Sequence, residues 1–73
     1  MAAAASTKHL LRQLKDKDAS RRKAAIKALA RAKDRNALTQ LARMSGDDRD
    51  AGVRELALKA GQYILHDTGG IEA

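Results

Sequence analysis

Three closely spaced aspartates, Asp47, Asp48 and Asp50, are the residues of this chain whose types and spacing first suggest chemistry. Alternating carboxylates begin the calcium-binding loops of proteins, because Ca²⁺ prefers oxygen ligands. Counted from Asp48, the sixth position of such a loop is Val53 where glycine is required, and the twelfth is Lys59 where glutamate is required. The spacing therefore favours helix capping in a solvated turn over a metal site.

The two histidines, His9 and His66, have no second histidine or carboxylate at ligand spacing beside them. The 73 residues contain no cysteine, which excludes thiolate catalysis and cysteine-ligated zinc. The sequence also contains no glycine-rich phosphate loop, no pair of acid and base carboxylates and no triad pattern. It predicts a protein without catalytic residues, metal or cofactor.

The composition is that of a small helical domain. Apolar residues make up 44% of the chain, with Tyr63 the single aromatic, and there is no proline. Alanine, leucine, lysine, arginine and glutamine are good helix formers, and small side chains let helices pack closely around a thin core. We predict one all-α domain. The first residues lack the charged opening and the long apolar run of a secretory signal, and the sequence has no apolar run of the ~20 residues that a membrane span needs, so we expect a cytoplasmic protein with no membrane partner.

Helical periodicity and capping residues predict four helices. The first begins at Ser6 or Thr7 and ends near Lys15, the second runs from a cap at Asp18 to about Ala32, the third runs from a cap at Asp34 through Met44, and the fourth covers about 51–66. Ser45 and Gly46 are expected to stop the third helix in a left-handed conformation. The main inward positions are Leu10, Leu11, Leu14, Ala25, Ile26, Leu29, Leu38, Leu41, Ala42, Val53, Leu56, Ala57, Ala60 and Ile64.

A repeat organises these helices. Residues 18–29 recur thirty-two positions later as residues 50–61. Repeated helical pairs bury their apolar faces against neighbouring copies, so the repeat predicts a short α-solenoid of two helical hairpins. Within one domain of residues 1–73, the first repeat covers 8–33, the second covers 34–66, and 67–73 form a flexible tail. Five extra residues in the second copy are expected to lengthen its first helix and the following loop.

At these positions the chain resembles the HEAT-repeat family, in whose second helix an aspartate is followed by valine and arginine three and four residues later, and then by alanine or leucine. The matching residues are Asp50, Val53, Arg54, Ala57 and Ala60 in the second copy and Asp18, Arg22, Ala25, Ala28 and Leu29 in the first. Arg21 stands where the pattern has valine, so the first copy is atypical. The resemblance covers about residues 8–66 and implies a HEAT-like fold.

Asp18 with Arg22, and Asp50 with Arg54, are i, i+4 pairs at predicted helix starts. Each aspartate can cap backbone N–H groups, and each arginine can bridge back to the aspartate of its own helix. In the HEAT family the matching residues tie neighbouring repeats together in a polar ladder, so the resemblance implies the same role here. We interpret these four residues as architecture.

Positive charge is concentrated in the first half of the chain. The formal net charge is +6, and residues 1–35 carry eleven Lys and Arg against three Asp. Six of these basic residues form two stripes at helical spacing, Lys8, Arg12 and Lys15 on the first helix and Lys23, Lys27 and Arg31 on the second. Such stripes are either solvated helix faces or contacts to an acidic protein surface or to nucleic-acid phosphates. The basic half has no aromatic residue on which bases would stack.

Leu58 and Leu65, on either side of Gly61, define a second apolar stripe on the fourth predicted helix. In a longer array this stripe would receive the next repeat, and two repeats are fewer than independent stability usually needs. We expect this edge to dock a partner, to self-associate or to belong to an array completed elsewhere. The alternative is that both leucines pack under Tyr63 and Ile71.

These observations predict a non-catalytic interaction or scaffolding module whose favoured partner is a protein, an acidic one being a candidate. The main alternative is nonspecific nucleic-acid binding through the basic first repeat, which would be dominated by phosphate contacts and sensitive to salt. A helix-turn-helix reader of DNA bases is disfavoured, because the helix that carries Lys27 lacks the Asn and Gln side chains that read base edges.

Overall fold

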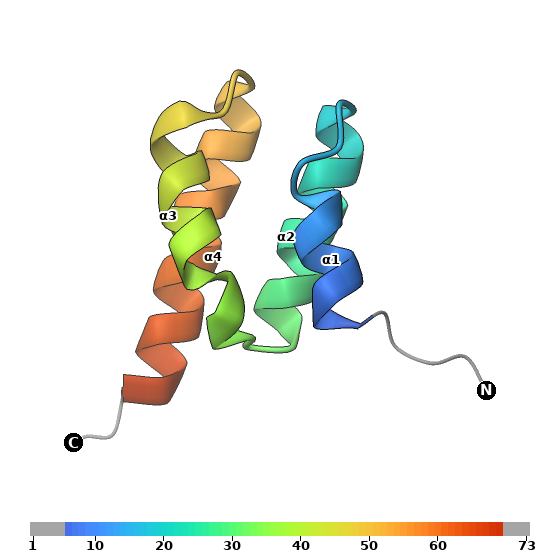
Figure 1. Ribbon diagram of the computed structural model, residues 1–73. Coiled ribbons are helices and arrows are strands. Elements are labelled where there is room, and N and C mark those ends of the chain that lie inside the picture. The colour runs from blue at the N-terminus through green and yellow to red at the C-terminus, as the bar shows by residue number, and fades with distance from the viewer. Residues whose placement is uncertain (1–5, 70–73) are drawn as a thin grey trace.

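The computed structural model describes residues 6–69, with side chains described for residues 6–66. Its elements are α1 (Thr7–Gln13), α2 (Ala19–Arg31), the short 3₁₀ helix η1 (Arg35–Ala37), α3 (Leu38–Asp47) and α4 (Ala51–Gly69). α1 and α2 form one hairpin and α3 and α4 form the second, and the hairpins stand side by side with their inter-helix loops at the same end (Figure 1). Every element in this part of the chain is helical, so the predicted all-α solenoid of two hairpins is confirmed.

The helices begin at side chains that complete their first turns. Ser6 Oγ accepts a hydrogen bond from the His9 N–H at 3.1 Å, and Asp18 Oδ1 accepts one from the Ser20 N–H at 2.8 Å. These N–H groups have no carbonyl partner within the first helical turn, so each cap removes an unsatisfied donor. Asp34 also caps, but it caps η1, accepting a backbone N–H two residues later at 3.0 Å, and α3 follows η1 directly.

The predicted stop of the third helix was wrong. α3 continues through Ser45 and Gly46 to Asp47, and no described glycine has a positive φ. The reason is that the hydrogen-bond ladder persists beyond Gly46, since the Asp48 N–H still donates to the Met44 carbonyl at 3.1 Å. Gly46 is therefore an ordinary helical residue.

The extra residues of the second hairpin lie in its helix and not in its loop. η1 and α3 together cover 35–47 where α1 covers 7–13, whereas the loop at 48–50 is shorter than the loop at 14–18. The expected lengthening of the loop is therefore wrong. α1 ends at Gln13, which leaves Lys15 in the loop, and α4 extends to Gly69, so the predicted tail boundary at 67 falls inside a helix. Residues 70–73 of that predicted tail lie outside the described residues.

The residue that separates the two hairpins is Lys33, whose φ of 53° is left-handed. Its N–H donates to the Ala30 carbonyl at 2.9 Å, and the Asp34 N–H donates to the Leu29 carbonyl at 3.1 Å. This pair of hydrogen bonds is the Schellman C-cap, which most often uses glycine because a Cβ is unfavourable in the left-handed region. It ends α2 and turns the chain into the second hairpin.

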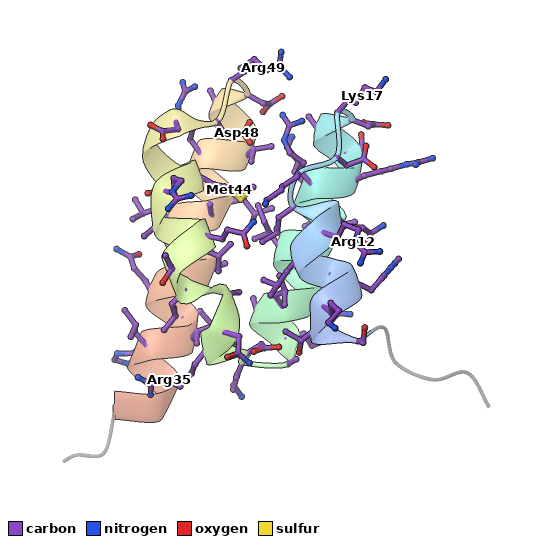
Figure 2. The ribbon with its side chains drawn as sticks, viewed as in Figure 1. Arg12, Lys17, Arg35, Met44, Asp48 and Arg49 are labelled. Atoms are coloured by element: carbon purple, nitrogen blue, oxygen red, sulfur yellow. The ribbon has the colours of Figure 1, made fainter. Side chains whose placement is uncertain are left out.

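The core is a thin, alanine-rich layer between and within the hairpins. Its buried apolar residues are Leu10, Leu14, Ala25, Ile26, Leu29, Ala37, Leu41, Met44, Val53, Ala57, Ala60 and Ile64. The predicted inward position Ala42 is wrong, because it is exposed and lines the side of α3 next to Leu58 and Leu65. Ala37 and Met44 are buried apolar residues that are absent from the predicted inward positions, and in Figure 2 the Met44 side chain points between the hairpins.

Candidate functional site

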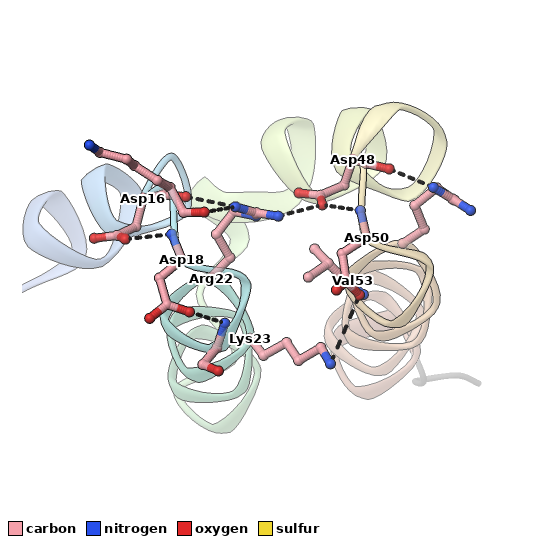
Figure 3. A network of polar contacts seen from close by, with 10 residues as sticks. Asp16, Asp18, Arg22, Lys23, Asp48, Asp50 and Val53 are labelled. Atoms are coloured by element: carbon pink, nitrogen blue, oxygen red, sulfur yellow. Dashed lines mark hydrogen bonds and ion pairs between the residues drawn. The ribbon is translucent and has the colours of Figure 1, made fainter.

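A polar network joins the two hairpins at their loop ends (Figure 3). Arg22 Nη1 donates to the carbonyls of Asp16 and Lys17 in its own loop, at 2.8 and 3.0 Å. Its Nη2 donates to Oδ1 of Asp48 in the second hairpin at 2.9 Å, and the two side chains are only 8% and 7% exposed. A buried, hydrogen-bonded ion pair of this kind costs several kcal/mol to break from one side, because the other charge is left buried. Arg22 therefore stabilises the stacked arrangement of the two hairpins.

The within-helix pairing predicted for Arg22 and Arg54 was wrong. In the described structure neither guanidinium bonds the aspartate four residues before it; Arg22 reaches Asp48, and Arg54 Nη1 donates to the Asp48 carbonyl at 2.7 Å. The physical reason is that the carboxylates of Asp18 and Asp50 already accept backbone N–H groups at the helix starts. Each arginine therefore binds the loop that precedes its own helix, and Arg22 also binds the second hairpin.

The sequence analysis did not predict the turn formed by Asp16 or the contact of Asp48 with the first hairpin. Asp16 Oδ1 accepts the Asp18 N–H at 2.8 Å, and Asp48 Oδ1 accepts the Asp50 N–H at 2.9 Å, so both hairpins use the same turn before their second helix. The signal was present, because each of these aspartates lies two residues before a capping aspartate and the two are themselves thirty-two residues apart. Within the aspartate cluster, Asp48 and Asp50 are therefore acceptors of backbone N–H groups in the turn.

A second ion pair between the hairpins supports the first. Lys23 Nζ lies 3.9 Å from Asp50 Oδ1, with both side chains more than a third exposed. The same carboxylate accepts the Val53 N–H at 3.0 Å, which is the main reason that the pKa of Asp50 lies below its ordinary value. An exposed pair at this distance contributes little to stability. Lys23 is nevertheless partly neutralised, which removes one charge from the predicted basic stripe.

The residues of the predicted basic stripes lie on α1, on α2 and in the loop between these helices. On the first hairpin, Lys8 and Arg12 are exposed on α1 and Lys15 is exposed in the loop, whereas Lys27 and Arg31 are exposed on α2. Lys23 and Lys27 line a shallow groove between α2 and α4, which Glu55 and Lys59 share. Because Lys59 Nζ lies 3.5 Å from Glu55 Oε2 and Lys23 pairs with Asp50, acidic groups interrupt the positive charge of this groove.

The largest exposed apolar residues lie on the second hairpin. Leu58 and Leu65 are each 51% exposed, and with Gly61 between them they line a groove of about 400 Å³ on the far side of α3 and α4. The remaining lining residues are Leu38, Thr39, Ala42, Ser45, Ala57 and Gln62. A Cβ built on Gly61 would meet no other atom within 4 Å, so Gly61 opens a hollow between the two leucines. We call Arg54, Leu58, Gly61 and Leu65 the end face.

The described part of the chain holds no group of three or more His, Cys, Asp or Glu side chains placed to bind a metal ion. At the loop end, Asp47 lines a hollow together with Lys15, Lys17 and Arg49, so charges of both signs alternate there. Within residues 6–69, no helix is both long and apolar enough to span a membrane.

The comparisons with known proteins agree with this architecture. The family model described as HEAT repeats matches residues 1–60. No curated protein matches the chain, and no solved structure matches it either. The matched segment contains both hairpins up to the middle of α4, including both copies of the aspartate and arginine motif. The chain therefore belongs to the HEAT-repeat family.

Proposed function

We propose that this chain is a non-catalytic protein-binding module that uses the end face of its second hairpin. The observation that carries the proposal is the exposure of Leu58 and Leu65 around the hollow at Gly61. Single exposed leucines are common, but two that flank an apolar groove favour burial against another protein. Membership of a repeat family that generally serves as a scaffold supports the same function.

Charge supports a protein partner over a nucleic acid. The basic groove between α2 and α4 contains two ion pairs, Lys23 with Asp50 and Lys59 with Glu55. Tyr63 is the single aromatic residue, and Lys33 Nζ already lies 5.4 Å from its ring centroid. Nucleic-acid binding uses Lys and Arg side chains that neutralise phosphates and aromatic rings on which bases stack. The carboxylates beside this groove therefore compete with phosphates for its lysines.

The test is affinity capture from the native host with the intact chain and two variants. We expect Leu58→Gln with Leu65→Gln to lose the captured protein, whereas the control Ala24→Gln, also an exposed helix position but on the first hairpin, keeps it. Circular dichroism checks that each variant keeps its helix content. Equal capture by all forms would overturn the proposal.

Titration with random duplex DNA and RNA at two salt concentrations tests the alternative function. We expect weak binding to both. Tight binding that weakens steeply with salt, and that is lost in Lys27→Gln with Arg31→Gln, would instead make the chain a phosphate-binding module. The two experiments together separate the two classes of partner.

A further inference from the structure

The loop of the second hairpin holds Arg54 in the way that the loop of the first hairpin holds Arg22. Arg22 Nη1 donates to the Asp16 carbonyl at 2.8 Å, and Arg54 Nη1 donates to the Asp48 carbonyl at 2.7 Å. The two arginines are thirty-two residues apart and lie on equivalent turns of α2 and α4. Their guanidinium groups are therefore positioned by the same backbone contact.

The contact of Arg22 with the second hairpin shows which group such an arginine binds across the interface between two hairpins. Its Nη2 donates to the carboxylate of Asp48 at 2.9 Å. Next to it along α2, Ile26 and Leu29 are completely buried. The equivalent residues on α4 are Leu58, 51% exposed, and Gly61, which adjoins open space. The end face thus repeats the pattern of the internal interface, with an arginine followed by apolar positions four and seven residues later.

A second copy of this chain is poorly suited to cover the end face. The face that it would present is the free side of its first hairpin, where Arg21 replaces Val53 and the exposed Ala32 replaces Ile64. The carboxylate that corresponds to Asp48 is Asp16, and Arg21 Nη1 lies 3.8 Å from Asp16 Oδ2. At these two positions that side therefore lacks the large apolar side chains of the second hairpin, and its own cation competes for the carboxylate.

We propose that the end face binds a helical hairpin of a different protein, one that presents an aspartate or glutamate in the loop before its second helix. The carboxylate pairs with Arg54, and aliphatic side chains of the partner's second helix cover Leu58 and Leu65 and fill the hollow at Gly61. The inference rests on the proposed function as a protein-binding module and specifies the chemistry of its partner. It extends to α4 the contacts that α2 makes inside the molecule.

The chain supplies its own probe for this chemistry. The probe is this protein with Arg21→Val and Ala32→Ile, which give its first hairpin the residues that the second hairpin uses to stack, and with Leu58→Gln and Leu65→Gln, which block its own end face. Asp16 of the probe then supplies the carboxylate. We expect the intact chain to sediment as a monomer and to form a 1:1 complex with the probe.

Arg54→Met in the intact chain, or Asp16→Asn in the probe, should each weaken this complex at least about 10-fold, because a buried charge is left unpaired. The matched control Lys27→Met removes a positive charge outside the end face and should leave the affinity unchanged. If the probe with four substitutions does not fold, Arg21→Val with Ala32→Ile alone should form head-to-tail oligomers that Arg54→Met dissociates.

Three outcomes with the purified proteins would overturn the inference. One is a complex whose affinity does not depend on Arg54, and another is the absence of any complex or oligomer. The third is an intact chain that dimerises and becomes monomeric on Leu58→Gln, which assigns the end face to a second copy. A host protein that is lost by the leucine variants but kept by Arg54→Met would sink this inference and leave the proposed function standing.

Discussion

The two hairpins carry the same aspartate and arginine motif, but only one copy of it is buried. Arg22 bonds its own loop and the carboxylate of Asp48 with a side chain that is 8% exposed, whereas Arg54 is partly exposed and bonds its own loop. Ile26 is completely buried and its counterpart Leu58 is half exposed. The contribution of a repeated residue to stability therefore depends on the neighbouring residues that cover it, and the motif alone does not determine it.

The largest expected difference is between the apolar counterparts. Ile26→Ala should lower the free energy of unfolding by about 4 kcal/mol, because it leaves a cavity between the hairpins. Leu58→Ala should change it by less than about 0.5 kcal/mol, since an exposed helix position favours alanine. Urea denaturation of both variants measures the difference. Equal losses would show that the end face is already covered in the free protein.

The arginines should differ almost as strongly. Arg22→Met is expected to cost about 3 kcal/mol, because Asp48 remains buried without its cation. Arg54→Met removes one hydrogen bond at a partly exposed position and should cost about 1 kcal/mol. Thermal unfolding of the pair compares them. A loss at Arg54 as large as that at Arg22 would contradict the different burial of the two copies.

Acid should weaken the interface between the hairpins. Burial acts to raise the pKa of Asp48, but hydrogen bonds from the Asp50 N–H and from Arg22, with the charge of Arg22, outweigh it and hold the pKa below its ordinary value. A carboxyl with a lowered folded pKa stabilises the fold above its unfolded pKa of about 4, and this stability is lost as the pH falls through the folded pKa.

The free energy of unfolding should therefore fall between about pH 5 and pH 2. Asp48→Asn should be less stable at pH 7 and should show a smaller fall over the same range. Urea denaturation across the pH series checks both statements. A variant with an unchanged pH dependence would assign the acid sensitivity to other carboxyls, among them Asp34, whose pKa is lowered mainly by the hydroxyl of Thr7.

The smallest difference concerns the ends of the second helices. Lys33 is left-handed at the end of α2, and its counterpart Leu65 lies inside α4. Lys33→Gly should stabilise the chain by about 0.5 kcal/mol, since relief of the left-handed backbone exceeds the loss of the contact with Tyr63. Leu65→Gly should cost about 1 kcal/mol of helix propensity. Changes of opposite sign in the melting temperatures of the two variants support the different backbone conformations of the two positions. A destabilised Lys33→Gly contradicts them.

Much of the fold was predictable because its signals are local. The caps at Ser6 and Asp18 and the inward stripe of α4 act within a few residues, and the structure confirms them. The stop predicted at Gly46 failed because a glycine ends a helix only where the backbone turns left-handed, and at Lys33 the chain makes that turn with a lysine. The presence of a glycine in the sequence therefore does not show which helix end adopts the left-handed conformation.

The sequence by itself determined that this protein is a pair of helical hairpins with a repeated turn before each second helix, since helical period, capping and repetition are written in neighbouring residues. Only the tertiary structure decided which copy of the motif is buried. Arg22 meets the carboxylate of Asp48 twenty-six residues away, and that contact exists because the hairpins stack. The same stacking buries Ile26 and leaves Leu58 on the outer side, where the next contact depends on another molecule.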